Sequence, residues 1–302
     1  MAADRAGHTP VMPSQVCELL SVREDDTVLD ATVGLAGHAT LFAEALGKTG
    51  RLIGLDVDPA VLEFARRRLC GADCRVELKQ ANFSEAPEVL RAVGITHVDV
   101  LFADLGVNSA QLDEAGRGFS FQRDGPLDMR MDPTLTVTAA DLVNRMKERE
   151  LSDLLYHNAQ EMGSRRIARR ICRVRREGRI TTTGRLAEIA ADALGVDPAS
   201  RRAKIHPATR TFLALRMAVN DEIPHLHRLL TQAPDMLAAG GRVGMIAFHS
   251  VEDKLVKSDF RKRKAEGIYE IVTKKPVTAG PDERRRNPRS RSAKLRVAVR
   301  LS

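Results

Sequence analysis

The chain has 302 residues, and 43% of them are hydrophobic, which is enough for one large α/β domain or for one that carries a second domain. Its net charge is +8, but residues 254–302 hold 16 Lys or Arg against 5 Asp or Glu, so the excess lies at the C-terminal end and indicates an anionic partner such as nucleic acid. No apolar run approaches the roughly 18 residues of a membrane span, no signal peptide is evident and the four cysteines form no CxxC pair; we therefore expect a cytoplasmic protein with reduced cysteines and no membrane or metal partner.

Short apolar runs predict the strands of a parallel sheet. They lie at 28–29, 52–55, 76–78, 98–102 and 243–248. Between the second and third runs, residues 61–69 carry an apolar face at helical spacing. The alternation of strand and helix is typical of a doubly wound α/β fold.

A turn of small residues follows the first strand. After Asp30 the chain reads Ala-Thr-Val-Gly-Leu-Ala-Gly-His to His38, and a helix is expected next. Such a turn lets a ligand approach the backbone closely and leaves the helix N-terminus open. A dinucleotide would need G-x-G-x-x-G for its pyrophosphate, whereas Gly34, Ala36 and Ala39 stand here. The spacing therefore favours S-adenosylmethionine, which has no phosphate, over NAD.

Further candidate residues stand where the next strands end. Asp56 ends the second strand, at a position suited to ribose hydroxyls. Phe83 follows the third strand and either stacks on an adenine or belongs to the core. Asp104 ends the fourth strand, where a ligand crevice should open, although it could instead cap a helix.

The α/β pattern is interrupted after residue 112. We predict a methyltransferase-type domain in two parts, 1–112 and 208–302, with a mostly helical insertion at 113–207. Within the insertion, seven arginines lie between Arg165 and Arg176 around an apolar side, which slightly favours contact with phosphates over a solvated face. The apolar alternation at 294–301 predicts that the basic C-terminal segment folds back as a strand.

Several motifs together resemble one family. They are His8–Met12 (HTPVM), Asp104–Asp113 (DLGVNSAQLD), Arg117–Phe121 (RGFSF), Asp124–Asp132 (DGPLDMRMD), His206–Phe212 (HPATRTF), Phe248–Asp253 (FHSVED) and Asn287–Ser292 (NPRSRS). The chain resembles the bacterial ribosomal RNA small subunit methyltransferase H (MraW) family from His8 to its C-terminus, and the segment DGPLDMRMD is highly specific.

The resemblance implies a Rossmann-like class I methyltransferase sheet with an inserted, mostly helical domain. It implies S-adenosylmethionine-dependent N4-methylation of a cytidine in the decoding centre of 16S rRNA, at the P site, within the small ribosomal subunit. The family's cofactor-binding positions correspond to Ala36, Gly37, His38, Asp56, Phe83, Asp104 and Gln111.

The sequence departs from the family pattern in five places. Ala36 replaces a common Gly, Asn108 a common Ser and Ala110 a common Pro. Asn-Ala-Gln-Glu at 158–161 replaces Tyr-Gly-Glu-Glu, and the segment between Gly267 and Gly280 is short. The first change should be tolerated, whereas the last two bear on substrate contacts.

The implied reaction needs an acceptor for the hydrogens of the cytosine amine, whose lone pair is delocalised into the ring. Asp104 is the first candidate for this catalytic role, and Asn108 or backbone carbonyls are the alternatives. The reaction requires no metal and no covalent nucleophile. His249, Asp128 and Arg130 could each hold the substrate or serve only the structure.

Two other functions remain open at this stage: a methyltransferase for another substrate, such as DNA or protein, and a ribosome-assembly factor. A methyltransferase acting on DNA would usually have Pro-Pro-Tyr after its catalytic acid, whereas Leu105-Gly106-Val107 follows Asp104. A ribosome-assembly factor without catalysis would give Asp56 and Asp104 no reason to stand at strand ends beside a glycine turn. Binding of S-adenosylmethionine by the purified protein separates the methyltransferases from the assembly factor.

Overall fold

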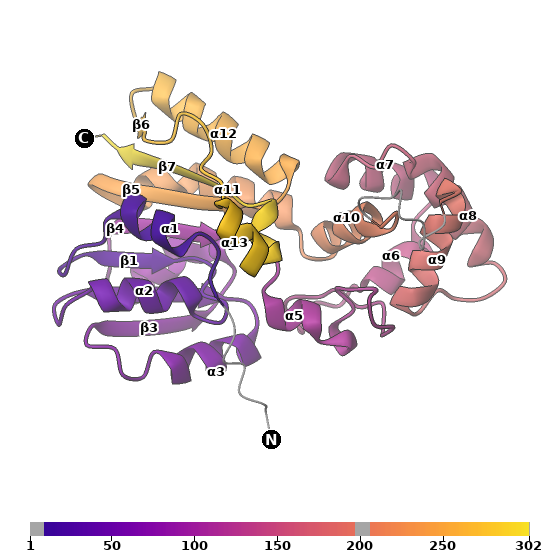
Figure 1. Ribbon diagram of the computed structural model, residues 1–302, viewed down its shortest axis with the longest axis horizontal. Helices are drawn as coiled ribbons and strands as arrows, with labels where there is room; N and C mark the ends of the chain where they lie inside the picture. Colours follow the sequence, from indigo (N-terminus) through magenta and orange to yellow (C-terminus); the bar gives the residue numbers. More distant parts are fainter. Residues whose placement is uncertain (1–8, 197–205, 302) are drawn as a thin grey trace. The chain divides into compact units, whose positions relative to one another are not determined.

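The computed structural model describes residues 9–196 and 206–301. The chain forms two compact units, of which the first comprises Met1–Gly106 with Ile223–Ser302 and the second Val107–Glu222. In Figure 1 the colours of the first unit therefore come from both ends of the bar, and those of the second come from its middle.

A seven-stranded sheet in the order β3-β2-β1-β4-β5-β7-β6 forms the centre of the first unit. Strands β1 to β5 pair in parallel, and β7 runs antiparallel to both of its neighbours. The strands are β1 (Thr27–Asp30), β2 (Arg51–Asp56), β3 (Arg75–Gln80), β4 (Val98–Asp104), β5 (Leu237–Ala247), β6 (Tyr269–Ile271) and β7 (Lys294–Arg300). This arrangement confirms the predicted doubly wound α/β fold.

Helices cover both faces of this sheet. The apolar sides of α1 (Pro13–Leu20), α2 (Gly37–Ala45) and α3 (Pro59–Arg68) pack into one core cluster. Those of α4 (Ala86–Ala92), α11 (Glu222–Met236) and α12 (Ser250–Ala265) pack into the other. Because both faces are covered, the parallel strands are nearly continuous apolar runs, which is why the sequence revealed them.

The C-terminal segment does fold back onto the sheet. β7 lies between β5 and β6, with Leu295 and Val297 fully buried. A short helix α13 (Pro281–Arg286) precedes it. β6 has only three residues, too few to show a period, so its strand could not be predicted from the sequence.

The second unit is helical, as expected. It contains α5 (Ser109–Asp113), α6 (Ala139–Arg145), α7 (Glu148–Ala159), α8 (Ser164–Val174), α9 (Thr183–Leu194) and α10 (Thr209–Val219). Ile167, Ile171 and Val174 of α8 are buried in its core, as their spacing predicts. No helix in the described part of the chain is long and apolar enough to cross a membrane.

The limits of the second unit differ from those predicted for the insertion. It begins at Val107 rather than at 113 and ends at Glu222 rather than at 207. The reason is that α10 packs on α6 and α7 and buries Phe212 and Leu215 in their core, whereas the prediction placed it with the sheet.

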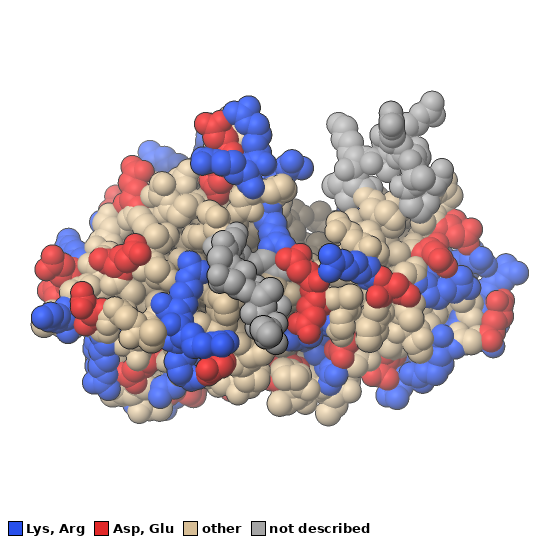
Figure 2. Space-filling model, turned by 60° about the horizontal axis from the view of Figure 1, so that its bottom comes forward, with Lys and Arg blue, Asp and Glu red and all other residues tan. Residues whose placement is uncertain are grey.

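On the face drawn in Figure 2, acidic and basic side chains are interspersed over the described residues.

Candidate active site

Three carboxyl groups stand where neighbouring strands of the first unit end. Asp30 is the last residue of β1, Asp56 of β2 and Asp104 of β4. β1 pairs with β2 on one side and with β4 on the other. The parallel register therefore brings to one edge three acids that lie far apart in the sequence.

The loop between β1 and α2 is shaped for close approach. Gly34 and Ala36 both have positive φ, at 50° and 59°. Such a conformation costs a residue with a Cβ about 1–2 kcal/mol, so alanine at position 36 is tolerated but strained. A Cβ on Gly37 would lie 3.1 Å from the Pro10 ring, which explains the glycine there.

Asp56 holds this loop in place. Its carboxylate accepts hydrogen bonds from the backbone N–H of Gly34 at 3.1 Å and of Asp58 at 2.9 Å. A carboxylate has about four acceptor positions, so capacity for a ribose hydroxyl donor remains. Burial raises the pKa of Asp56 to about 6, and the backbone hydrogen bonds oppose this shift only in part.

Asp30 is a site residue that sequence reasoning did not single out. Its side chain is buried and accepts a hydrogen bond from the backbone N–H of Thr32 at 3.1 Å. Burial, followed by repulsion from Asp56, raises its pKa to about 7. An acid directly before the small-residue turn was the available signal, since it ends a predicted strand just as Asp56 does.

Asp104 has the least satisfied carboxyl group of the three. Its Oδ1 atom is buried and has no hydrogen-bond partner among the described residues, while Oδ2 lies 3.7 Å from Nδ1 of His38. Burial raises its pKa well above the ordinary value, and the charges of Asp30 and Glu252 raise it further. This carboxyl group thus has a free acceptor and gains from a cation or an N–H donor nearby.

His38 connects this acid to the N-terminal segment. Its Nε2 donates to the backbone carbonyl of Val11 at 2.8 Å, which turns Nδ1 toward Asp104. The ring packs against Phe102 at a centroid distance of 4.7 Å. His38 is buried, so its position is fixed by contacts on both sides.

Phe83 is half-buried at the end of β3, in the short helix η1 (Phe83–Glu85). It packs at the margin of one core cluster and meets the ring of His225 edge-on at 6.3 Å. His225 is held by a hydrogen bond to the Ser84 hydroxyl at 2.9 Å. One side of the Phe83 ring is therefore held by the core and by His225. The exposed part of the ring is available to a planar ligand.

His249 and Glu252 serve the start of α12. Nδ1 of His249 accepts the backbone N–H of Glu252 at 3.4 Å, and Nε2 lies 3.0 Å from the Glu252 carboxylate. Glu252 in turn accepts the backbone N–H of Phe248 at 2.9 Å. The pair forms a capping box, so the structural role considered for His249 accounts for its contacts.

The remaining predicted residues belong to the second unit. Gln111 is buried and exchanges capping hydrogen bonds with Asn108, whose side-chain oxygen accepts the Gln111 N–H at 3.0 Å. Asp128 and Arg130 form a two-pronged ion pair at 2.7 and 2.8 Å, and Arg130 also donates to the Leu135 carbonyl. This network holds the loop that contains them, in agreement with the structural reading of the two residues.

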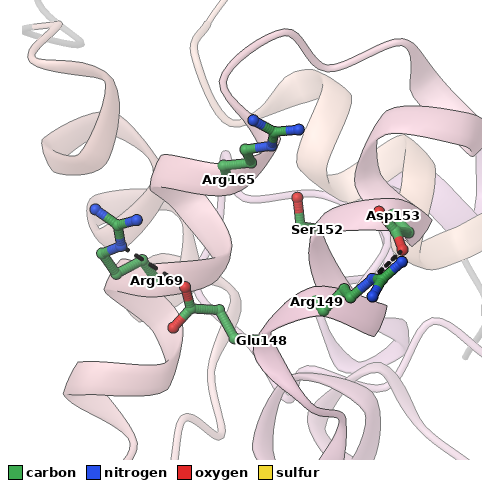
Figure 3. A pocket seen from close by; sticks show the side chains of 6 residues that line it. All are labelled: Glu148, Arg149, Ser152, Asp153, Arg165 and Arg169. Atoms are coloured by element: carbon green, nitrogen blue, oxygen red, sulfur yellow. Dashed lines mark ion pairs between the residues drawn. The ribbon is translucent and has the colours of Figure 1, made fainter.

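The arginine-rich helix α8 is partly committed to structure. Arg170 pairs with Asp192 at 2.6 Å, and Arg175 donates to the backbone carbonyls of Val143 and Met146. Figure 3 shows a pocket between α7 and α8, lined by Glu148, Arg149, Ser152, Asp153, Arg165 and Arg169. Arg149 pairs with Asp153 within α7, and Arg169 of α8 pairs with Glu148 of α7. Phosphate contact by α8 therefore stays a prediction that rests on its other arginines.

Comparison with known proteins identifies the family of this chain. The model of the MraW methylase family matches residues 5–301. The ribosomal RNA small subunit methyltransferase H of Acidobacterium capsulatum is 47% identical over 98% of this chain and 99% of its own, and that of Geobacter sulfurreducens is 46% identical over 97% and 99%. Among solved structures, a putative rRNA-methylase from Clostridium thermocellum aligns over 96% of this chain and 93% of its own, with 11% identity and a TM-score of 0.46.

The family match confirms S-adenosylmethionine as the cofactor expected from the sequence. The residues present fit this group. The donor is a sulfonium cation, and the first unit offers acidic groups at three strand ends with one buried oxygen unpaired. Because the match extends over nearly the whole chain, the chain belongs to the MraW methylase family.

Proposed function

We propose that this methylase transfers a methyl group from S-adenosylmethionine to N4 of a cytidine in the decoding centre of 16S rRNA, at the P site. The relatives are named as small-subunit rRNA methyltransferases, which supports the class of substrate. We place the reaction in the cytoplasm, on the small ribosomal subunit. The observation that carries the proposal is the unpaired Oδ1 of Asp104 at a strand end beside two further acids.

In this proposal the loop and strand ends hold the donor. The backbone of Ala36 and Gly37 and the ring of His38 would line its amino-acid part, Asp56 its ribose hydroxyls and Phe83 its adenine. Gln111 stays a candidate through its place in the family's motif. Asp30 adds a negative charge next to the loop. When bound, S-adenosylmethionine supplies an electrophilic methyl group on a positively charged sulfur.

Asp104 then acts on the substrate. The exocyclic nitrogen of cytosine must become tetrahedral to attack, and its hydrogens need an acceptor while it does so. Oδ1 of Asp104 is the free acceptor among the residues described above. A cation bound nearby would lower the raised pKa of this carboxyl group and leave it ionised for that role.

Asn108 is less suited to the same role. Its side-chain oxygen already accepts the backbone N–H of Gln111, so an amine hydrogen would have to share that atom. A purely non-catalytic assembly role is less favoured, because the unpartnered Oδ1 of Asp104 stands at a strand end beside two further acids and the small-residue loop, where a ligand could supply its donor.

The deciding experiment combines cells and purified protein. Nucleosides from the 16S rRNA of cells that lack this protein should have lost one N4-methylcytidine when analysed by mass spectrometry. Purified protein with S-adenosylmethionine should restore it on small subunits from those cells. Unchanged nucleosides in the deficient cells, or restored methyl groups on another atom, would overturn the proposed substrate.

A further inference from the structure

One face of α12 carries a row of cations. Lys254, Lys257, Arg261 and Lys264 follow one another at spacings of three, four and three residues, which places them on one side of an α-helix. Lys254, Arg261 and Lys264 are exposed and Lys257 is half-buried. No acidic residue occupies the positions between them on that side.

The buried side of α12 fixes the position of this row. Val256 and Phe260 are buried in the core cluster between the helix and the sheet. The helix packs on β5, β6 and β7, all within the first unit, and Figure 1 shows it along that part of the sheet. The row therefore lies along the flank of the helix, next to its buried side, with three of its four cations exposed.

The other cations of α12 have partners, whereas these four do not. Lys262 pairs with Glu266 at 3.8 Å, and Arg263 with Asp259 at 3.7 Å. Within the described residues, none of the four cations in the row forms an ion pair or a side-chain hydrogen bond. Their charges are thus available to a ligand.

The helix dipole does not explain the row. Cations near a helix C-terminus are stabilised by it, which would account for Arg261 and Lys264. Lys254 and Lys257 lie in the first half of α12, where a cation gains nothing from the dipole. A partner with several negative charges would account for the whole row.

The row starts beside the candidate active site. α12 begins three residues after β5 ends, and its capping residue Glu252 is close enough to Asp104 to raise the pKa of that acid. A rise of 1.5 Å per residue places Lys254 and Lys264 about 15 Å apart along the axis. The row thus leads away from the reacting carboxyl group.

We propose that this face of α12 binds successive phosphates of the RNA strand that flanks the target nucleotide. The inference rests on the proposed function for its substrate and adds the path of that substrate along the first unit. A row of unpaired cations suits a polyanion whose charges repeat along a chain, and it would supply affinity without contributing to the chemical step.

The test compares two variants that lose the same charge. One combines Lys254→Gln, Lys257→Gln, Arg261→Gln and Lys264→Gln. The control combines Lys48→Gln, Arg67→Gln, Lys79→Gln and Arg91→Gln, which are exposed cations of the first unit outside α12. Binding to small subunits from cells that lack this protein is measured against potassium chloride concentration, together with donor affinity and the single-turnover methylation rate at saturating subunits.

We expect the slope of log affinity against log salt to become shallower by about 3–4 in the α12 variant, because each phosphate contact contributes about 1. The control should keep the wild-type slope. Both variants should keep the donor affinity and the saturated rate. Lys254→Gln with Lys257→Gln alone should remove about half of the effect.

The outcomes separate the two proposals. Equal slopes for the α12 variant and the control would overturn the α12 inference, whatever the methylation assay gives. Wild-type protein that binds subunits but transfers no methyl group would overturn the proposed function, and the slopes would still decide the role of α12. Wild-type protein that does not bind subunits at all would overturn both.

Discussion

At the scale of single residues, the three acids at the strand ends have surroundings that disfavour their ionised form. Asp30 is buried, Asp56 and Asp104 are half-buried, and each has a raised pKa. In the protein without ligand, ionising these acids costs free energy. A cationic ligand nearby offsets that cost. Such a site favours a positively charged cofactor through charge alone, in addition to any hydrogen bonds.

The catalytic assignment of Asp104 predicts a separation of rate from binding. Asp104→Asn keeps the shape but removes the charge and presents an NH₂ donor where an acceptor is needed. The methyl-transfer rate at saturating S-adenosylmethionine should fall by about 10²–10⁴-fold, which is the usual contribution of a positioned acid or base. Single-turnover methylation of small subunits lacking the modification, at several donor concentrations, measures it.

The control for this variant is its affinity for the donor, measured by calorimetry. A residue that only binds the donor would raise the concentration needed and leave the saturated rate nearly intact. A saturated rate equal to that of the wild type would therefore remove Asp104 from the chemical step and return the role to Asn108 or to backbone carbonyls.

The raised pKa values also predict how donor binding depends on pH. For Asp30 and Asp56, whose folded values of about 7 and 6 exceed the ordinary 3.8, the contribution to stability is present below the ordinary value and is lost as the pH rises through 6 to 7. The ionised forms attract the sulfonium cation. Donor affinity should therefore increase roughly tenfold from pH 5.5 to pH 7.5.

Calorimetric titration across this range measures the effect, and Asp30→Asn provides the control. This variant cannot ionise at position 30, so its affinity should change less with pH than that of the wild type. An affinity that is constant from pH 5.5 to 7.5 in the wild type would contradict the raised pKa values as the origin of donor selection.

At the scale of elements, the structure separates what the sequence could reveal from what it could not. Asp56 and Asp104 could be predicted because an acid that directly follows an apolar run is a local signal. The coupling of Asp30 to Asp104 could not, because it depends on the pairing of β1 with β4, which are about 70 residues apart. Likewise, the apolar side of α10 does not predict whether this helix packs on the sheet or on the other helices of the second unit.

The partners of individual side chains could not be predicted from the sequence either. The seven arginines at 165–176 suggest a common role in phosphate contact. In the structure, however, Arg170 pairs with Asp192, and Arg175 donates to two backbone carbonyls at the end of α6. His249 looked like a possible substrate contact because it follows a strand. Its N-cap geometry depends on Glu252 three residues later, and a histidine is an uncommon residue at that position.

The capping role of His249 gives a prediction about α12. His249→Ala removes the acceptor of the Glu252 N–H, and the free energy of unfolding should fall by about 0.5–2 kcal/mol. His249→Asn supplies a new acceptor and should recover most of that loss. Urea unfolding of both variants, analysed with a common slope, measures the difference.

The saturated methylation rate distinguishes this role from contact with the substrate. A cap acts through the fold, so both variants should turn over at nearly the wild-type rate well below their unfolding midpoints. If both lose about a hundredfold in rate while their stability stays at the wild-type value, His249 contacts the reacting groups and the capping account is insufficient.

At the scale of the whole molecule, the two units of the chain have cores of different kinds. The first unit buries a sheet between two layers of helices, and the second buries helices against one another. The acids and the loop discussed above all belong to the first unit, although its two chain segments are separated by the whole of the second. The first unit is therefore completed only when residues from both ends of the chain have come together.

This division predicts two unfolding transitions that respond separately to substitution. Leu101→Ala in β4 and Leu155→Ala in α7 each remove a fully buried side chain, one from each core. Each should cost about 2–5 kcal/mol and lower the midpoint of one transition. S-adenosylmethionine at a hundred times its dissociation constant should stabilise the donor-binding unit by about 2.7 kcal/mol, which scanning calorimetry detects as a raised midpoint.

The pairing of these effects is the informative result. If the acids of the first unit bind the donor, the transition that the donor raises is the one that Leu101→Ala lowers, and Leu155→Ala leaves the size of the donor shift unchanged. A donor that raises only the transition lowered by Leu155→Ala would place its binding energy in the second unit and contradict the assignment of Asp30, Asp56 and Asp104. A single transition lowered by both substitutions would show instead that the two cores unfold as one cooperative body.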